Sequence, residues 1–158
     1  MTRPALPSCV ALEPYYHARP WSAALAGKRV LVVHPFRRTI LAQYEKRTQL
    51  FPGKDVLPEL ASLTVIQAVQ GLGGQDTGYA DWFDALTEME RRMDAADYDV
   101  AIVGAGAYSL PLAAHARDTG HAAIQMSGAT QLLFGIEGKR WDDHPVISKL
   151  YNPAWGPS

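Results

Sequence analysis

Four short runs of apolar residues, rich in valine and other β-branched side chains, recur along the chain. They span residues 28–34, 62–69, 98–104 and 121–126. Runs of this length without polar alternation are typical of strands buried on both faces of a sheet. Between and after them, apolar residues recur at spacings of three and four, the period of a helix with one buried face. The pattern predicts helices at about residues 35–49, 82–93, 107–120 and, for a short one, 127–136.

The helix at 82–93 has the clearest pattern, and its apolar residues are predicted to belong to the core. They are Trp82, Phe83, Leu86, Met89 and Met93. Asp76 or Thr77 is expected to cap this helix, since both side chains can accept a backbone N–H. Pro35 suits the first position of the helix at 35–49, where a missing N–H is tolerated. The four glycines of residues 70–78 predict a flexible loop.

Strands that alternate with helices indicate crossover connections and therefore a parallel sheet. Right-handed crossovers with helices on both faces predict an α/β, Rossmann-like, doubly wound sheet of about four strands in the order 2-1-3-4. The 158 residues are expected to form a single domain. Its predicted parts are an extended N-terminal arm with four prolines at residues 1–20, an α/β core at 21–136 and an aromatic tail at 137–158.

Composition narrows the class of protein. The net charge is -1 and no long basic block occurs, which argues against a nucleic-acid partner held by phosphate contacts. No apolar run reaches the roughly 18 residues that a membrane span requires, and the prolines and Glu13 near the N-terminus do not fit a signal peptide. Cys9 is the single cysteine, so an internal disulfide is excluded. We expect a cytoplasmic protein that needs neither membrane nor nucleic acid.

In an open parallel sheet, ligands bind beyond the carboxyl ends of the strands, where successive crossovers diverge. That point is predicted between the strands at 28–34 and 98–104, and the loops after three strands are expected to converge there. The candidate substrate-binding residues are Arg37 and Arg38 after the first strand, Gly104, Ala105, Gly106, Ala107 and Ser109 after the third, and Ser127, Gly128, Ala129, Thr130 and Gln131 after the fourth. Small residues and free helix N–H groups at this edge favour a phosphate.

Each of these features also has a purely structural interpretation. Arg37 and Arg38 lie at a helix N-terminus, where a cation is unfavourable by itself, so they are either an anion site or a solvated pair. His34 has either a polar role at the site or a structural one. The stretch 104–109 differs by one residue from the dinucleotide fingerprint, but it follows the third strand and no acidic residue ends the next, which disfavours NAD. The histidines have no metal-ligand spacing, and no metal site is predicted.

Several stretches carry a family resemblance in this order: "LEPYYH", "GKRVLVVHPF", "QYEKRTQLF", "DWFDALTEM", "AIVGAGAYSLPLAAHARDTGHAAI" and "GATQLLFGIEGKRW". Together they resemble the C-terminal part of a group of mostly uncharacterised proteins related to GT-D-type glycosyltransferases. The resemblance covers nearly the whole chain from about Leu12 onward. It implies a Rossmann-like fold that binds a nucleotide sugar, with acidic residues and a divalent cation assisting transfer.

This chain departs from that pattern in two ways. The longer relatives carry an upstream half with an Asp-Gly-Glu type motif, which is not found here. The acidic pair that follows the last strand of GT-D enzymes is replaced by residues 128–131, which contain no carboxylate. We therefore expect a minimal enzyme, one half of a split enzyme with a separate N-terminal partner chain, or a binding domain that has lost its chemistry.

Three functional hypotheses follow. In the first, Arg37, Arg38, Lys139 or Arg140 stabilises the diphosphate leaving group of a nucleotide sugar, and His34 or Tyr108 orients the sugar or transfers a proton. The second is a non-catalytic module that binds a nucleotide or another small anion, as a homo-oligomer. The third is a partner-dependent subunit whose tail docks on another chain. The tail residues considered for docking are Tyr151 and Trp155.

Overall fold

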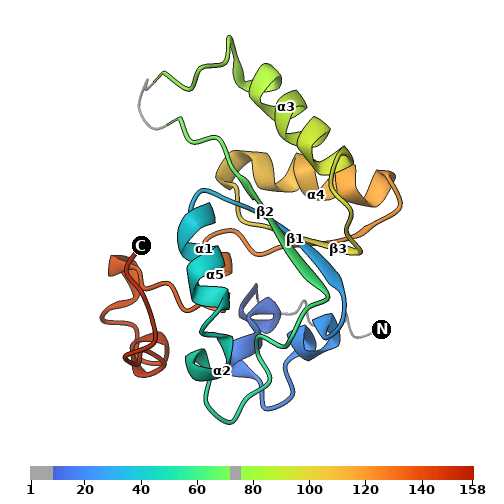
Figure 1. Cartoon of the computed structure of the whole chain (residues 1–158). Coiled ribbons are helices and arrows are strands. Elements are labelled where there is room, and N and C mark those ends of the chain that lie inside the picture. Colours follow the sequence, from blue (N-terminus) through green and yellow to red (C-terminus); the bar gives the residue numbers. More distant parts are fainter. Residues whose placement is uncertain (1–8, 72–75) are drawn as a thin grey trace, which may run out of the picture.

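The computed structural model describes residues 9–71 and 76–158 and shows a four-stranded, all-parallel sheet (Figure 1). Its strands are β1 (Arg29–His34), β2 (Ser62–Gln67), β3 (Val100–Val103) and β4 (Ala122–Gln125). Their spatial order is β2-β1-β3-β4, which confirms the predicted doubly wound topology. Val33 pairs with Ile66 on one side and with Val103 on the other, and Val103 pairs with Gln125. The carboxyl ends of all four strands therefore lie level, along one rim.

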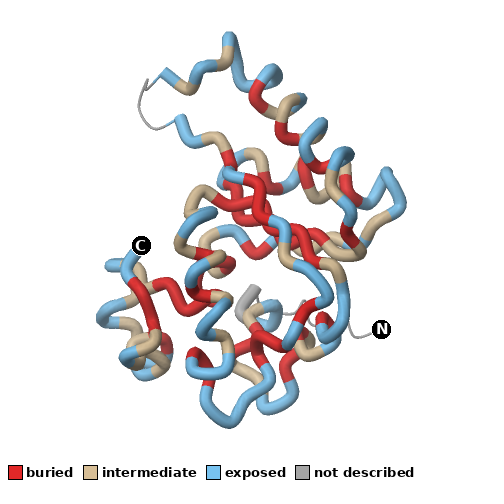
Figure 2. The backbone as a smooth tube through the Cα atoms, viewed as in Figure 1, coloured by how far each residue is buried: buried red, intermediate tan, exposed pale blue. Residues whose placement is uncertain are grey.

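Helices cover both faces of the sheet. They are α1 (Arg37–Tyr44), α2 (Arg47–Leu50), α3 (Trp82–Asp94), α4 (Ser109–Asp118) and α5 (Ala129–Leu133), with short 3-10 helices at Cys9–Leu12, Pro14–Tyr16, Trp21–Leu25, Gly106–Tyr108, Lys139–Trp141 and Ile147–Lys149. Leu31 and Val33 pack in one cluster with buried residues of α3 and α4, while Val30 and Val32 pack in another with residues that include Tyr15 and Trp155. Figure 1 shows α3 and α4 on one side of the sheet and α1, α2 and α5 on the other. The central strands β1 and β3 are almost entirely buried (Figure 2). The edge strands are more open than predicted: only Val65 and Ile66 of β2 are buried, and no residue of β4 is.

The helix predicted at 35–49 is divided into α1 and α2, and Pro35 precedes it in a turn. His34 explains the late start, because its Nδ1 accepts the Phe36 N–H at 3.1 Å and holds the chain in a non-helical turn. At the other end, Lys46 N–H bonds to the Gln43 carbonyl, three residues back rather than four. Gln43 is itself buried, and its amide donates to the carbonyls of Gly135 and Ala154. The apolar periodicity of residues 35–49 is continuous, but the helix is interrupted after Tyr44, next to the contacts that Gln43 makes with distant parts of the chain.

The predicted cap and the predicted core aromatics of α3 were both wrong. Asp81 caps the helix by accepting the Asp84 N–H at 2.9 Å. The buried residues of α3 are Ala85, Met89 and Met93, whereas Trp82 is 37% and Phe83 is 69% exposed. The first turn of α3 extends beyond the rim of the sheet, so no strand lies beneath its aromatic side chains (Figure 1). Residues 72–75, in the predicted flexible loop, lie outside the described residues.

The arm and the tail pack against the core. Residues 1–8 lie outside the described residues, and residues 9–16 form 3-10 turns rather than an extended arm. Tyr15 is buried and stacks on Phe51, with ring centroids 6.3 Å apart. Trp155 packs on the same Phe51 ring and donates its indole N–H to the Leu50 carbonyl at 3.0 Å. Its ring is enclosed by its own chain, so the docking role considered for it is not available in this fold.

Across residues 9–71 and 76–158, no helix is long and apolar enough to span a membrane.

Candidate functional site

The loops after β1, β3 and β4 meet at Gly104, as the strand order predicts. A β-carbon built on Gly104 would lie 2.5 Å from Thr130 Oγ1, 2.6 Å from the Ser127 carbonyl oxygen and 2.8 Å from His34 Cδ2. We call these four residues the Gly104 junction. The junction is close-packed, so the expected single pocket over residues 104–109 and 127–131 is not formed. Side chains of the loops themselves occupy the space between them.

Three of the predicted substrate-binding residues, Ser109, Thr130 and Gln131, are buried polar groups within the packed loops. Ser109 Oγ accepts the Ala105 N–H at 2.7 Å, and the Gln131 amide donates to the Glu137 carbonyl at 3.0 Å. Thr130 Oγ1 is buried and has no hydrogen-bond partner among the described residues. These side chains position the loops rather than face a ligand.

His34 is 3% exposed, and burial lowers its pKa to about 4, so the ring is neutral at physiological pH. Its Nδ1 accepts the Phe36 N–H, which places the proton of the neutral ring on Nε2. The lone pair that a general base would use is therefore already occupied. The structure supports a positioning role for His34, which sets the turn that leads into Arg37.

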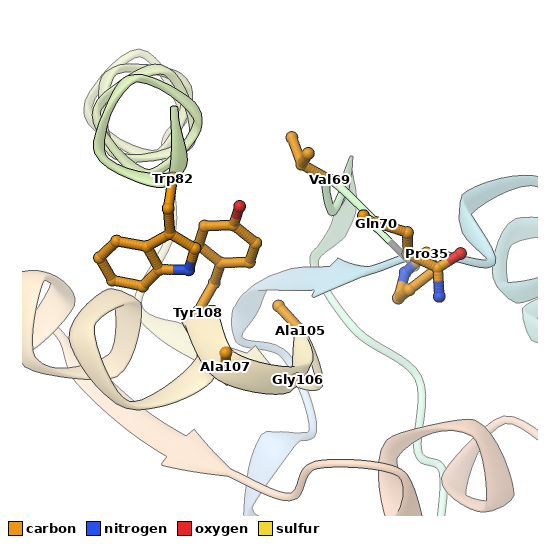
Figure 3. Close-up of a pocket in the computed structure, with 9 residues that line it drawn as sticks. Pro35, Val69, Gln70, Trp82, Ala105, Gly106, Ala107 and Tyr108 are labelled. Carbon is orange, nitrogen blue, oxygen red and sulfur yellow. The ribbon is translucent and has the colours of Figure 1, made fainter. Parts of the chain in front are cut away.

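A hollow of about 270 Å³ lies on the α3 side of the rim (Figure 3). We call it the Tyr108 hollow. It is lined by Pro35, Val69, Gln70, Gly71, Trp82, Ala105, Gly106, Ala107 and Tyr108. The loops after β1, β2 and β3 and the first residue of α3 build it, whereas the loop after β4 takes no part. Sequence reasoning placed residues 105–108 at this edge but missed the loop after β2 and Trp82.

The wall of the Tyr108 hollow is aromatic and uncharged. The rings of Tyr108 and Trp82 stack at 5.0 Å between centroids, with 6° between their planes. Tyr108 lies between Trp82 and the side formed by Pro35, Val69 and Gln70 (Figure 3). None of the described lining residues is charged, and Gln70 supplies both an amide donor and an acceptor. Such a wall suits a flat, uncharged group with polar edges.

A shallower depression adjoins this hollow at Pro35. We call it the arginine depression; its volume is about 340 Å³, and its lining residues are Pro35, Phe36, Arg37, Arg38, Thr39 and Gln67. Arg37 Nε donates to the Val65 carbonyl at 2.9 Å, which fixes the direction of its guanidinium. Within the described parts of the chain, no carboxylate lies within 4.0 Å of either arginine. Two adjacent cations are thus left for an external anion.

The other predicted cations lie elsewhere on the rim. Arg140 lies against Gly128, where a β-carbon would be 1.6 Å from its Nη2 atom, and its guanidinium stacks on Trp141 at 3.8 Å. Lys139 is exposed at the start of the same 3-10 helix. The four candidate basic residues therefore form two separate groups, Arg37 and Arg38 beside β1 and β2, and Lys139 and Arg140 beside the loop after β4.

No protein-family model, curated protein or solved structure matches this chain. Among the residues that the structure describes, no three histidine, cysteine, aspartate or glutamate side chains are grouped so as to hold a metal. The described residues therefore offer no ready-made ligand cluster for the divalent cation that the resemblance implied, and no step is assigned to one.

Gly104→Ala is expected to lower the free energy of unfolding by about 2 kcal/mol, because two of the three close contacts are with rigid neighbours. Urea unfolding measures this loss. Gly53→Ala is the matched control, since a β-carbon there meets nothing within 4 Å and only the positive φ of 75° opposes it. That control should lose about 1 kcal/mol. Equal losses in the two variants would contradict a close-packed junction.

Proposed function

We propose that this chain binds a nucleoside diphosphate group, as carried by a nucleotide sugar, across Pro35. The observation that carries the proposal is that an uncharged hollow with an aromatic pair shares Pro35 with a depression lined by two arginines, neither of which pairs with a carboxylate in the described parts of the chain. A nucleotide has the same two parts, a flat base with polar edges and a chain of phosphates. The base would lie in the Tyr108 hollow and the phosphates over the arginine depression.

Base binding is supported by the chemistry of the hollow. The Tyr108 ring offers a face for stacking, and Trp82 holds that ring in place from behind. Stacking on an aromatic side chain contributes about 1–3 kcal/mol per base. Gly106 has a positive φ of 58° and no atom within 4 Å of a built β-carbon, so the backbone is open to a ligand there. The Gln70 amide can pair with donors and acceptors on a base edge.

Phosphate binding is supported by Arg37 and Arg38. A guanidinium can donate two parallel hydrogen bonds to a phosphate and stays charged at any physiological pH. The bond from Arg37 Nε to the Val65 carbonyl leaves its terminal nitrogens for the ligand. In a glycosyl transfer, the same cations would stabilise the negative charge that develops on the departing diphosphate.

A non-catalytic nucleotide-binding module is the second candidate. It is favoured by His34, whose Nδ1 lone pair is occupied, and by the lack of any acidic cluster among the described residues. Incubation of the pure chain with a nucleotide sugar separates the two candidates. Release of free sugar or of nucleoside diphosphate supports an enzyme, whereas binding without turnover supports a module.

Calorimetric titration with UDP-, GDP-, CMP- and dTDP-sugars tests the proposal. We expect one of these ligands to bind, and Tyr108→Ala to weaken its affinity about tenfold because the stacking face is lost. Tyr108→Phe keeps the ring and is the matched control, with affinity close to that of the unchanged chain. The proposal fails if no nucleotide binds, or if Tyr108→Ala binds as tightly as Tyr108→Phe.

A further inference from the structure

A third depression lies at the carboxyl end of β4. The sequence predicted a site at this end of the strand, but it did not predict that Glu13 would contribute to one. We call this depression the Glu13 depression; its volume is about 220 Å³, and it is lined by Leu12, Glu13, Gln125, Met126, Ser127 and Ala129. It shares no lining residue with the Tyr108 hollow or the arginine depression. The fold brings the N-terminal segment against the loop after β4 and adds a carboxylate where that loop has none.

The Glu13 carboxylate is held in place. Its Oε2 atom accepts a hydrogen bond from the Tyr15 hydroxyl, and Tyr15 is itself fixed by stacking on Phe51. Burial, and then the bond to Glu13, raise the pKa of Tyr15, so its hydroxyl keeps its proton and remains a donor. The second carboxylate oxygen of Glu13 has no hydrogen-bond partner among the described residues. It can accept from a ligand.

Arg140 is not one of the lining residues, but it lies against Gly128, which stands between the lining residues Ser127 and Ala129 in the chain. The Trp141 ring supports its guanidinium, and none of the described carboxylates lies within 4.0 Å of it. Ser127 is exposed and has a φ of 50°, the one positive φ among the described non-glycine residues. Backbone strain of this kind often accompanies a functional turn. Here the turn places Ser127 in the wall of the depression that Glu13 also lines.

This combination selects among ligands. A phosphate would meet the Glu13 carboxylate at close range, and the repulsion would offset the attraction of Arg140. Vicinal hydroxyls fit better, because a carboxylate accepts two O–H bonds while a guanidinium, a serine hydroxyl and the Gln125 amide donate to hydroxyl oxygens. Leu12 and Met126 add apolar contact for the carbon face of a ring.

We propose that the Glu13 depression binds a monosaccharide unit through Glu13, Ser127 and Arg140. The site stands independently of nucleotide binding. Only its role as the acceptor site of a transferase rests on the function proposed above. A single sugar ring makes few contacts, so an affinity of about 1 mM is expected for it.

Amide NMR spectra of the full chain, titrated with methyl glucoside and methyl glucuronide, test the site. We expect shifts at Ser127, Gly128 and Ala129 and at the Trp141 indole. Glu13→Gln and Arg140→Gln should each weaken binding at least fivefold. Glu45→Gln and Arg117→Gln, which remove exposed charges elsewhere, should leave it unchanged.

Ser127→Gly keeps the test decisive if the other variants are poorly folded. Glycine suits the positive φ of this position, so the variant should fold well and still bind sugar more weakly. The proposal is overturned if neither glycoside shifts residues 127–129, if all three variants bind normally, or if inorganic phosphate binds there in place of sugar. A nucleotide should instead shift the amides of residues 105–108, so either proposal can fail without the other.

Discussion

Replacing both Arg37 and Arg38 with glutamine is expected to weaken the binding of a nucleoside diphosphate about 100-fold, or about 3 kcal/mol. Both guanidiniums line the depression that adjoins the Tyr108 hollow, and neither is paired with a carboxylate among the described residues. Binding of the corresponding nucleoside, which has no phosphate, should change by less than twofold. Isothermal titration of nucleoside, monophosphate and diphosphate with each variant measures the difference.

Arg117→Gln serves as the matched control, because Arg117 is exposed on α4 and pairs only with its neighbour Asp118. Arg38→Gln alone separates anion binding from folding, since Arg37 also donates to the Val65 carbonyl and its loss can destabilise the loop. Affinity for the diphosphate should fall as salt rises, and less steeply in the double variant. Equal losses for nucleoside and diphosphate would show that the arginines support the fold rather than the phosphates.

The stability of the protein is expected to decline by about 3 kcal/mol as the pH falls from about 6.5 to about 4, through His34 alone. Burial lowers the pKa of this side chain to about 4 in the folded state, whereas the unfolded chain binds the same proton near 6.5. Between these values the unfolded state carries more protons, so acid favours unfolding. Below about pH 4 the His34 ring is protonated in both the folded and the unfolded state, so it no longer changes the free energy of unfolding as the pH falls. Urea unfolding across this range measures the effect.

His34→Asn should remove most of the pH dependence of stability between about pH 6.5 and 4. The Asn side-chain carbonyl can still accept the Phe36 N–H, but it does not titrate. His17→Asn, at a less buried histidine, should leave the slope in place. Asp99 and Glu88 act at lower pH: arginines beside these carboxylates lower each pKa to about 2. Their stabilising contribution is present above about pH 4 and is lost as the pH falls toward 2. An unchanged slope in His34→Asn would contradict the buried, neutral ring.

Much of the fold was predictable because its signals are local. The valine-rich run at 28–34 has no polar alternation, and a strand of this kind must be covered on both faces. Alternation with helices then restricts the topology to few arrangements, and the predicted order 2-1-3-4 is the one observed. The level carboxyl ends followed from that order, so Tyr108 was correctly placed at the rim. The helical periodicity of α3 did not show that its first turn extends beyond the rim of the sheet. Trp82 lies in that turn and therefore lines the hollow instead of the core.

The sequence by itself determined the sheet, its strand order and the rim at which the ligand site was predicted. Local apolar patterns identify the strands and helices, and the right-handed crossovers between them restrict the order of the strands. Only the tertiary structure decided which rim residues are packed and which are open. Gly104, His34 and Thr130 fill one another's space, while Pro35 lines both the Tyr108 hollow and the depression that holds Arg37 and Arg38. It also brought Glu13 to Ser127, residues far apart in the chain that no sequence spacing relates. Contacts of this kind depend on the close packing of side chains from separate loops, which a one-dimensional pattern does not contain.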